Sequence, residues 1–253
     1  VTGAGGGLGR EHSLLLAQEG ASVVVNDLGG SRDGTGSGNS MADGVVEEIK
    51  AAGGKAVATY GSVTDDSAAA EMVKTAMNNF GRVDILINNA GILRDRSFKN
   101  MTDGEWDAVI EVHLKGAYLA TKHVWQQMLD QGEGGRIIMT SSTSGLIGNF
   151  GQTNYGAAKA GLAGFMRVLA LEGMKYGITV NVLAPGALSR MTEDLMPESE
   201  ETAERMDPAK VSPTVAWLCT PDAAKVTGRQ FCVSGNRVSL LSWQVDKIAE
   251  KDS

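Results

Sequence analysis

The chain has 253 residues, enough for one α/β domain with a full core. It carries 30 acidic and 23 basic side chains, and the net charge of −7 disfavours nonspecific binding to nucleic acid or to an anionic membrane surface. Two cysteines are too few for a disulfide framework, and no apolar run approaches the roughly 18 residues of a membrane span. We therefore expect a soluble intracellular protein without a structural metal, a nucleic-acid partner or a membrane span.

Short β-branched runs alternate with longer helical stretches along the whole chain, a pattern typical of a parallel sheet built from β–α–β units. The pattern predicts six strands, at 22–26, 56–60, 83–88, 136–141, 178–183 and 230–233. It predicts helices at 11–19, 41–52, 66–79, 103–129, 154–176 and 208–218. No charge run or proline-rich linker divides the chain, so residues 1–253 are expected to form a single domain.

The start of the chain is unusual, because Val1 and Thr2 directly precede a glycine cluster. A dinucleotide-binding turn normally follows a central strand of about five residues. A sheet without that strand would leave its two neighbours with unpaired backbone groups. We therefore expect the natural protein to extend further at its N-terminus, with most of the first strand missing from this chain.

The run from Thr2 to Gly9 holds five glycines and precedes a helical stretch. Such a run can be a flexible turn, but glycines also let a pyrophosphate approach the backbone at a helix N-terminus. Asp27 stands 18 residues after Gly9, at the end of the next predicted strand. A carboxylate there can accept both hydroxyls of an adenosine ribose, which favours a dinucleotide site.

Asp27 also favours NAD over NADP, because a carboxylate at this place repels the 2′-phosphate of NADP. Gly6 and Leu28 occupy neighbouring places where an NADP site would supply a basic residue. Arg10 and Arg32 are close in sequence, and we interpret them as solvated surface charges.

Tyr155 and Lys159 are one turn apart on the same face of a predicted helix. The same spacing is common in surface pairs. A cation near a phenol favours the phenolate, so we expect a lowered Tyr155 pKa and proton exchange with an alcohol or carbonyl. Ser142 follows the strand at 136–141, where its hydroxyl can reach the same reacting oxygen.

These motifs, with Asn88-Asn89-Ala90-Gly91 and Pro185-Gly186, resemble the short-chain dehydrogenase/reductase family over essentially the whole chain. The resemblance implies a doubly wound Rossmann sheet of seven parallel strands between two helix layers, and usually a dimer or tetramer. It implies that Tyr155 is the acid/base, that Ser142 polarises the substrate oxygen and that Lys159 holds the nicotinamide ribose. The cofactor contacts that it implies, besides Asp27, Tyr155 and Lys159, are Gly3, Gly7, Leu8, Gly9, Ser62, Val63, Asn89, Ala90, Gly91, Pro185 and Gly186.

Two positions depart from the family pattern. His113 stands where the family usually has a catalytic asparagine, on the helix after Asn-Asn-Ala-Gly. The family's proton relay runs through water near this place, so the His113 backbone carbonyl could serve, or His113 could only pack the helix. Ser62 and Val63 stand where many members place Asp-Val against the adenine, and serine can still form a hydrogen bond there.

Segments 26–30, 89–98 and 139–152 are more narrowly similar to the (3R)-hydroxyacyl-CoA dehydrogenase units of peroxisomal multifunctional β-oxidation enzymes and their free-standing bacterial relatives. This similarity implies hydride transfer between NAD and the 3-hydroxyl carbon of an acyl-CoA. It also implies a cytoplasmic location, or a peroxisomal one for a piece of a eukaryotic enzyme. The alternatives are a hydroxysteroid or sterol-side-chain dehydrogenase, an NADPH-dependent 3-oxoacyl reductase, and a non-catalytic dinucleotide-sensing regulator.

An acyl-CoA substrate requires a place for its phosphates on this acidic protein. Basic residues near the expected crevice are Arg94, Arg96, Lys99 and Arg190, which could instead pair with Asp95, Asp103 or Glu193. We expect segment 189–197 to form a mobile substrate lid. We expect the glycine-rich segment 28–44 to be a partly mobile flap that borders the adenosine end of the site.

Overall fold

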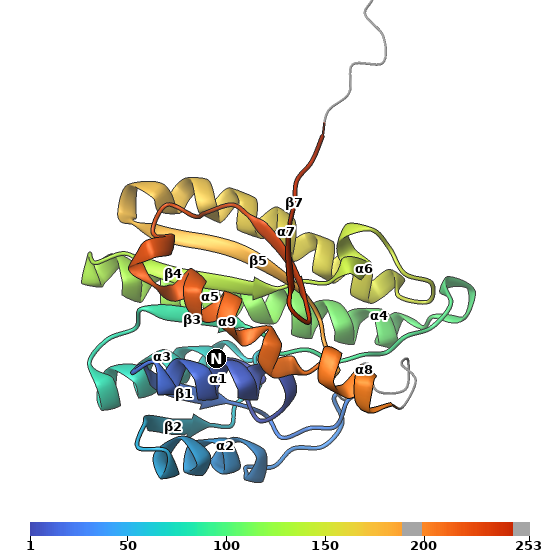
Figure 1. Cartoon of the computed structure of the whole chain (residues 1–253). Coiled ribbons are helices and arrows are strands. Elements are labelled where there is room, and N and C mark those ends of the chain that lie inside the picture. Colours follow the sequence, from blue (N-terminus) through green and yellow to red (C-terminus); the bar gives the residue numbers. More distant parts are fainter. Residues whose placement is uncertain (189–198, 245–253) are drawn as a thin grey trace, which may run out of the picture.

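A twisted sheet runs through the middle of the molecule, with helices on both sides (Figure 1). The computed structural model describes residues 1–188 and 199–244. Five strands pair in the order β3 (Ile85–Asn88), β4 (Gly135–Thr140), β5 (Ile178–Gly186), β6 (Gln230–Ser234) and β7 (Arg237–Leu241), and β1 (Ser22–Asn26) pairs with β2 (Lys55–Thr59). All of these pairs are parallel except β6 with β7. Each of the six predicted strands is present.

Residues 1–4 join the two groups of strands. The Asn26 N–H donates to the Val1 carbonyl at 3.0 Å, and the Ala4 N–H donates to the Asn26 carbonyl at 2.9 Å. On the other side, the Thr2 N–H donates to the Ile87 carbonyl at 3.0 Å. This short segment therefore lies between β1 and β3, at the place of the central strand, and the parallel strands follow the order expected for a doubly wound sheet.

Strand β7 is a correction to the expected sheet, which was to be parallel throughout and to end with residues 230–233. It turns back from β6 and pairs with it antiparallel through a tight turn at Gly235, whose φ is +55°, and Asn236. A Gly-Asn pair is a typical two-residue hairpin turn. Four of the five β7 side chains are exposed, so the strand lacks the apolar alternation that would have revealed it.

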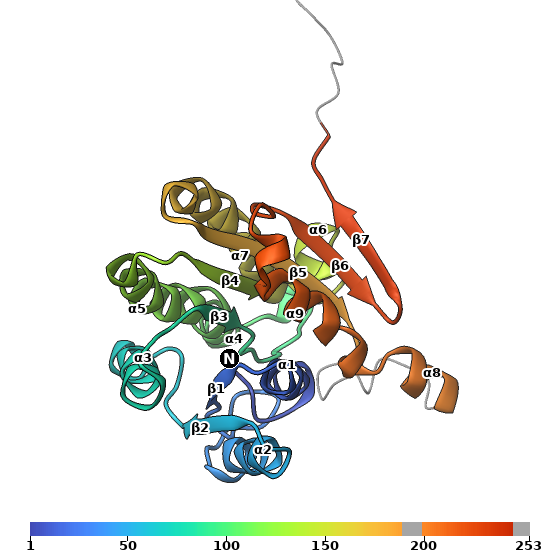
Figure 2. The same ribbon diagram turned by 60° about the vertical axis from the view of Figure 1, so that its left-hand side comes forward.

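The helices form two layers (Figure 2). Helices α1 (Gly7–Gln18), α2 (Ser40–Ala51) and α9 (Ser212–Cys219) cover one face, and α3 (Asp66–Phe80), α5 (Gly116–Gln131) and α7 (Thr153–Gly173) cover the other. Neighbouring strand residues serve opposite faces: Ile138 packs in the core under α1 and α9, whereas Ile137 and Met139 pack under α5 and α7. The three-layer architecture is thus confirmed. Two short helices that were not predicted, α6 (Thr143–Leu146) and α8 (Glu200–Arg205), lie in the connections.

The stretch predicted as one helix over 103–129 is interrupted. Helix α4 (Asp103–Ile110) begins with a capping box in which Thr102 and Glu105 satisfy each other's backbone N–H groups. A π-helical turn, Glu111–Lys115, then separates α4 from α5. A π turn holds one residue more than an α turn, and this one directs His113 into the interior, where it is 2% exposed.

Helix α1 packs so tightly against the first residues that Gly9 tolerates no side chain. A Cβ there would lie 2.2 Å from the Gly3 carbonyl oxygen and 2.9 Å from the Ala4 Cα. We predict that Gly9→Ala lowers the free energy of unfolding by about 1–3 kcal/mol. Gly44→Ala is the matched control, because a Cβ on exposed Gly44 in α2 meets nothing within 4 Å. This substitution should raise the free energy of unfolding by at most about 1 kcal/mol. Urea denaturation measures both, and equal effects would contradict the packing argument.

Candidate active site

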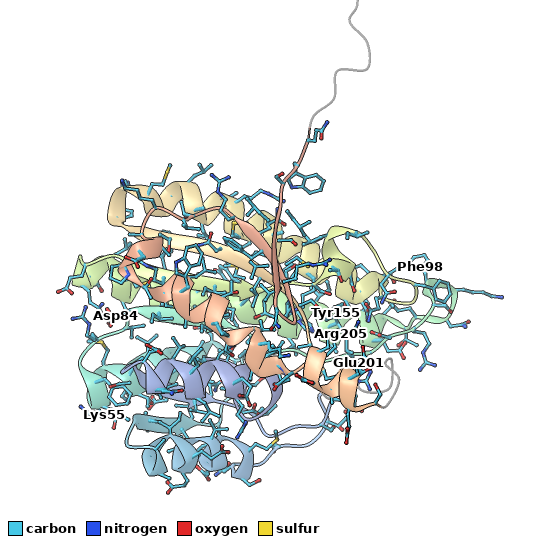
Figure 3. The ribbon with its side chains drawn as sticks, in the orientation of Figure 1. Lys55, Asp84, Phe98, Tyr155, Glu201 and Arg205 are labelled. Atoms are coloured by element: carbon cyan, nitrogen blue, oxygen red, sulfur yellow. The ribbon has the colours of Figure 1, made fainter. Side chains whose placement is uncertain are left out.

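A cleft of about 560 Å³ opens at the carboxyl ends of the parallel strands, where doubly wound sheets bind ligands. Its walls come from the segments that follow residues 1–4, β1, β2, β3 and β4, and from the end of β5. Tyr155 lies at this end of the sheet (Figure 3). Of the residues that the sequence singles out, the cleft is lined by Gly3, Gly6, Gly7, Leu8, Asp27, Leu28, Arg32, Ser62, Val63, Asn89, Ala90, Gly91, Arg94, His113, Ser142, Tyr155, Lys159 and Pro185. Arg32 was interpreted as a solvated surface charge, but it is partly buried and lines the cleft.

Two predicted cofactor contacts, Gly9 and Gly186, do not line this cleft. Gly9 faces the Gly3 carbonyl and the Asn89 side chain, so its small size serves the packing of α1. A Cβ on Gly186 would lie 2.9 Å from the Ser234 Oγ on the neighbouring strand β6. Glycine is required at both positions because neighbouring parts of the fold approach its Cα closely, and not because either residue is exposed in the cleft.

The Asn89 side chain fastens the glycine turn to the end of β3. Its Nδ2 donates to the carbonyls of Thr2 and Gly3 at 3.1 and 3.0 Å. The Thr2 hydroxyl oxygen in turn accepts from the backbone N–H groups of Asn89 and Ala90 at 3.0 and 3.1 Å. The turn backbone is therefore held in one conformation beside the N-terminus of α1.

Asp27 connects the glycine turn with the segment that follows β1. Its two carboxylate oxygens accept the backbone N–H groups of Gly5 and Gly29, both at 2.7 Å. The side chain is buried, yet it lines the cleft. Each carboxylate oxygen can accept more than one hydrogen bond, so both retain capacity for a ligand hydroxyl.

The glycine-rich segment after Asp27 borders the same part of the cleft, as expected. Gly30, Ser31 and Gly34 line it. The segment is fastened to the chain beyond β3, because the Leu93 N–H donates to the Arg32 carbonyl at 3.1 Å and the Arg94 Nε donates to the Asp33 carbonyl at 3.0 Å. Whether it moves when a ligand binds stays a prediction.

Ser142, Tyr155 and Lys159 meet at the opposite part of the cleft. The Lys159 Nζ lies 5.4 Å from the centre of the Tyr155 ring and donates to the Thr140 carbonyl at 2.5 Å. Ser142 caps α6 by accepting the Ser144 N–H at 3.1 Å, and its side chain also forms a hydrogen bond with Tyr155. The structure thus brings together the three groups that the sequence proposes for chemistry.

The expected lowering of the Tyr155 pKa is not found. Burial raises the pKa of the phenol to about 12, and the hydrogen bond with Ser142 offsets only part of that effect. Burial likewise lowers the pKa of Lys159 to about 7. The expectation counted the attraction of a nearby cation but not the loss of hydration that both groups suffer in a closed site.

His113 contacts the Tyr155 ring edge-on, with the ring centres 5.1 Å apart. Its Nε2 lies 2.8 Å from the Ile92 carbonyl oxygen and 3.1 Å from the Ile92 nitrogen. A Cβ on Gly91 would lie 2.3 Å from the His113 Cε1, so the glycine is needed to admit the ring. Burial and the charge of Lys159 keep the pKa of His113 well below its usual range.

Sequence reasoning missed a residue that places Tyr155. Asn154 is fully buried, its Oδ1 accepts the Tyr155 N–H at 2.7 Å, and its Nδ2 donates to the carbonyls of Arg94 and Glu105 at 3.0 and 3.1 Å. Its position at the start of the predicted helix, where asparagine is a common cap, is the signal that could have indicated it. Nearby, the Gln152 Nε2 donates to the Asp95 carboxylate at 2.6 Å.

The basic cluster proposed for CoA phosphates does not assemble as expected. Arg96 forms an ion pair with Glu105 at 2.9 Å, a partner that the sequence analysis did not consider. Arg94 lines the cleft, and Lys99 lies exposed beyond it in residues 98–100. Arg190 and the expected lid at 189–197 lie outside the described residues.

Comparison with known proteins gives a consistent result. The model of the short chain dehydrogenase family matches residues 1–202. The chain belongs to the short-chain dehydrogenase family. It is therefore an oxidoreductase that acts on CH–OH groups, and the family uses NAD or NADP. None of the helices in the described ranges is long and apolar enough to cross a bilayer.

Individual relatives cover most of this chain. Peroxisomal multifunctional enzyme A of Dictyostelium discoideum is 54% identical over 96% of the chain, which spans about half (54%) of that enzyme. A hydroxyacyl-CoA dehydrogenase of Mycobacterium tuberculosis is 41% identical, over 96% of the chain and 78% of the relative. A 3-oxoacyl-[acyl-carrier-protein] reductase of Synechocystis is 42% identical, over 94% and 95%. The crystal structure of a short chain dehydrogenase from Mycobacterium avium superposes with a TM-score of 0.86 at 47% identity, covering all of this chain and 89% of that one.

The buried Lys159 should cost stability in a pH-dependent way. Its pKa is about 7 in the folded chain and 10.5 when solvated, so the unfolded state binds more protons between these values and stability rises with pH across that window. We predict that Lys159→Met raises the free energy of unfolding of the cofactor-free protein by about 1–4 kcal/mol at pH 6 and by much less at pH 10. Urea denaturation at the two pH values checks this.

The exposed Lys74 provides the control for this prediction. Lys74→Met should leave the stability nearly unchanged at both pH values, because no burial penalty is removed. An equal gain from Lys159→Met at pH 6 and pH 10 would show that lost packing strain, and not charge burial, was relieved.

Proposed function

We propose that this chain transfers a hydride between NAD and the 3-hydroxyl carbon of a (3R)-hydroxyacyl-CoA, interconverting it with the 3-oxoacyl-CoA. The observation that carries the proposal is one cleft that holds Ser142, Tyr155 and Lys159 at one end and the glycine turn with Asp27 at the other. The names of the multifunctional enzyme and the hydroxyacyl-CoA dehydrogenase among the relatives support the substrate class.

The residues at the Asp27 end fit a dinucleotide. Gly3 and Gly7 have φ values of +62° and +49°, and a Cβ on Gly3 would lie 2.7 Å from the Ala90 Cα, so the turn presents bare backbone beside the N-terminus of α1. In our proposal Asp27 accepts the adenosine ribose hydroxyls. The remaining contacts are assigned to Leu8 beside the pyrophosphate, Ser62 and Val63 at the adenine, Asn89, Ala90 and Gly91 beneath the cofactor, and Pro185 beside the nicotinamide.

The chain's own groups manage the proton. NAD, when bound, supplies the acceptor for the hydride that leaves the substrate carbon. The Ser142 hydroxyl donates to the substrate oxygen, and Tyr155, in its phenolate form, takes the hydroxyl proton and becomes a phenol as the carbonyl forms. Lys159 lies close enough to the ring for its positive charge to favour the phenolate, which opposes the effect of burial on Tyr155.

We predict that Tyr155→Phe lowers kcat by about 10²–10⁴-fold while cofactor binding survives, because only the hydroxyl is removed. Tyr118→Phe is the control, since Tyr118 is half exposed on α5 and does not line the cleft. The assay is NADH formation with (3R)- and (3S)-hydroxyacyl-CoA of several chain lengths, beside hydroxysteroids. Turnover of steroids alone would replace the proposed substrate class, and retained activity in Tyr155→Phe would remove the assigned acid/base.

An NADPH-dependent 3-oxoacyl reductase is the second candidate, and the Synechocystis relative favours it. The buried Asp27 carboxylate at the ribose end argues against it. Arg10, the nearest basic residue on α1, is engaged with Glu11 and Glu48. We therefore place NAD before NADP.

Cofactor preference can be tested at Asp27. We predict that Asp27→Ala raises the KM for NAD by roughly 10–100-fold, because a charged hydrogen-bond acceptor is lost. The same substitution should reduce the preference for NAD over NADP. Asp130→Ala removes the same charge from an exposed place on α5 and should leave both values unchanged. An unaltered NAD/NADP ratio in Asp27→Ala would assign the preference to another group.

We also propose that the chain forms a homo-oligomer. Val168 and Leu171 on α7 are 55% and 67% exposed, and Tyr118 on α5 is 49% exposed, so these helices present apolar side chains to solvent. We further propose that the protein is located in the cytoplasm, or in the peroxisome if the chain is part of a longer eukaryotic enzyme.

A further inference from the structure

Two arginines in the wall of the cleft have no role in the function proposed above. Arg32 and Arg94 both line the cleft and are both partly buried. They come from segments that are far apart in the chain but bound to each other. The Leu93 N–H donates to the Arg32 carbonyl at 3.1 Å, and the Arg94 Nε donates to the Asp33 carbonyl at 3.0 Å. The two side chains therefore belong to one unit of the cleft wall.

This unit crosses the cleft in front of the glycine turn. The glycine-rich segment starts after β1, and it is fastened to the chain beyond β3. Residues 1–4 lie between β1 and β3 and lead directly into the turn. A connection from the end of β1 to the end of β3 must pass the carboxyl end of residues 1–4. Arg32 and Arg94 therefore face the turn from the other wall of the cleft.

The side of the cleft that carries the glycine turn supplies backbone N–H groups but no free cation. Arg10 on α1 is engaged with two glutamates. At the opposite end of the cleft, burial lowers the pKa of Lys159 to about 7 and keeps the pKa of His113 well below its usual range. Among the described residues that line the cleft, Arg32 and Arg94 are therefore the side chains that stay positively charged at neutral and alkaline pH.

We propose that Arg32 and Arg94 form a diphosphate-binding subsite that faces the glycine turn and neutralises the two phosphate charges of the dinucleotide. This inference rests on the dinucleotide site of the proposed function. A guanidinium suits a diphosphate, because it is planar, permanently charged and donates several hydrogen bonds in a fixed fork. In the described part of the chain, Arg94 uses one of its five N–H donors, on the Asp33 carbonyl, so its two Nη groups can donate to phosphate oxygens.

The phosphates of an acyl-CoA are the other source of the same chemistry, but the position of the arginines favours the dinucleotide. Arg32 belongs to the glycine-rich segment, which borders the Asp27 end of the cleft, and Arg94 is bound to that segment. A substrate must place its reacting carbon at Tyr155, at the other end. The diphosphate of the dinucleotide, which lies next to the adenosine ribose, is therefore the group that reaches this pair.

Ligand fragments can separate this subsite from the rest of the site. ADP-ribose carries the diphosphate, whereas adenosine carries only the base and its ribose. We expect Arg94→Met and Arg32→Met each to raise the Kd of ADP-ribose by about 10-fold or more, because a charged hydrogen bond is lost. The Kd of adenosine should change by less than about twofold in both variants. Calorimetry on the cofactor-free protein measures both ligands without turnover, and adenosine binding shows that the variants are folded.

Arg82→Met is the control for the change in net charge. Arg82 directly precedes β3 at the opposite edge of the sheet, and it pairs with Asp84 and Glu133. Its ADP-ribose binding should equal that of wild type. The Kd of ADP-ribose should also depend less on salt concentration in Arg94→Met than in Arg82→Met, because a charge that faces the phosphates is absent.

Each other outcome overturns the proposal in a distinct way. Equal loss of ADP-ribose and adenosine binding would show that the arginines only fasten the glycine-rich segment. Unchanged ADP-ribose binding in both variants would remove the subsite, and weaker binding of free coenzyme A in those variants would then assign the arginines to the substrate phosphates. Wild type that binds no NAD in the same series would refute the proposed dinucleotide site itself, together with this inference.

Discussion

The connection between the two halves of the sheet runs through residues 1–4. Their backbone hydrogen bonds reach Asn26 at the end of β1 and Ile87 in β3. Within the sheet, the half that carries Asp27 and the half that carries Tyr155 and Lys159 are therefore joined by this very short stretch of chain. The Asn89 side chain strengthens this connection by binding the Thr2 and Gly3 carbonyls. Outside the sheet, Leu93 and Arg94 add hydrogen bonds to the Arg32 and Asp33 carbonyls, so the geometry of the cleft depends on both connections.

The two ends of the cleft provide different numbers of hydrogen-bond partners for their buried ionisable groups. The Asp27 carboxylate accepts two backbone N–H groups, so it also organises the fold. Lys159 is buried beside a single carbonyl and a phenol, and its lowered pKa shows that the fold disfavours the charged form. The burial of Lys159 thus lowers the stability of the fold at the place proposed for the reaction. Such a compromise between stability and function is common at active sites.

Much of the fold and site could be predicted because the signals were local. Alternating strands and helices, the glycine turn and the Tyr155–Lys159 spacing each depend on a few neighbouring residues. The features that were missed depend on three-dimensional surroundings. The π turn occurs where the His113 ring contacts Ile92, 21 residues away in the chain, and local sequence does not reveal that contact. The raised Tyr155 pKa follows from enclosure by several segments, which a four-residue spacing does not reveal. Strand β7 has little apolar pattern because it lies exposed at the sheet edge.

The two backbone contacts of Asp27 link the proposed cofactor preference to the stability of the glycine turn. Its oxygens accept the N–H groups of Gly5 in the glycine turn and of Gly29 at the start of the glycine-rich segment. A basic residue at this position would attract a 2′-phosphate, but it would present donors to these two donors and leave both N–H groups without their acceptor. A change toward NADP therefore requires new acceptors for Gly5 and Gly29 as well as a new positive charge. The backbone of the turn therefore favours a hydrogen-bond acceptor at position 27, in addition to the proposed role of Asp27 at the cofactor.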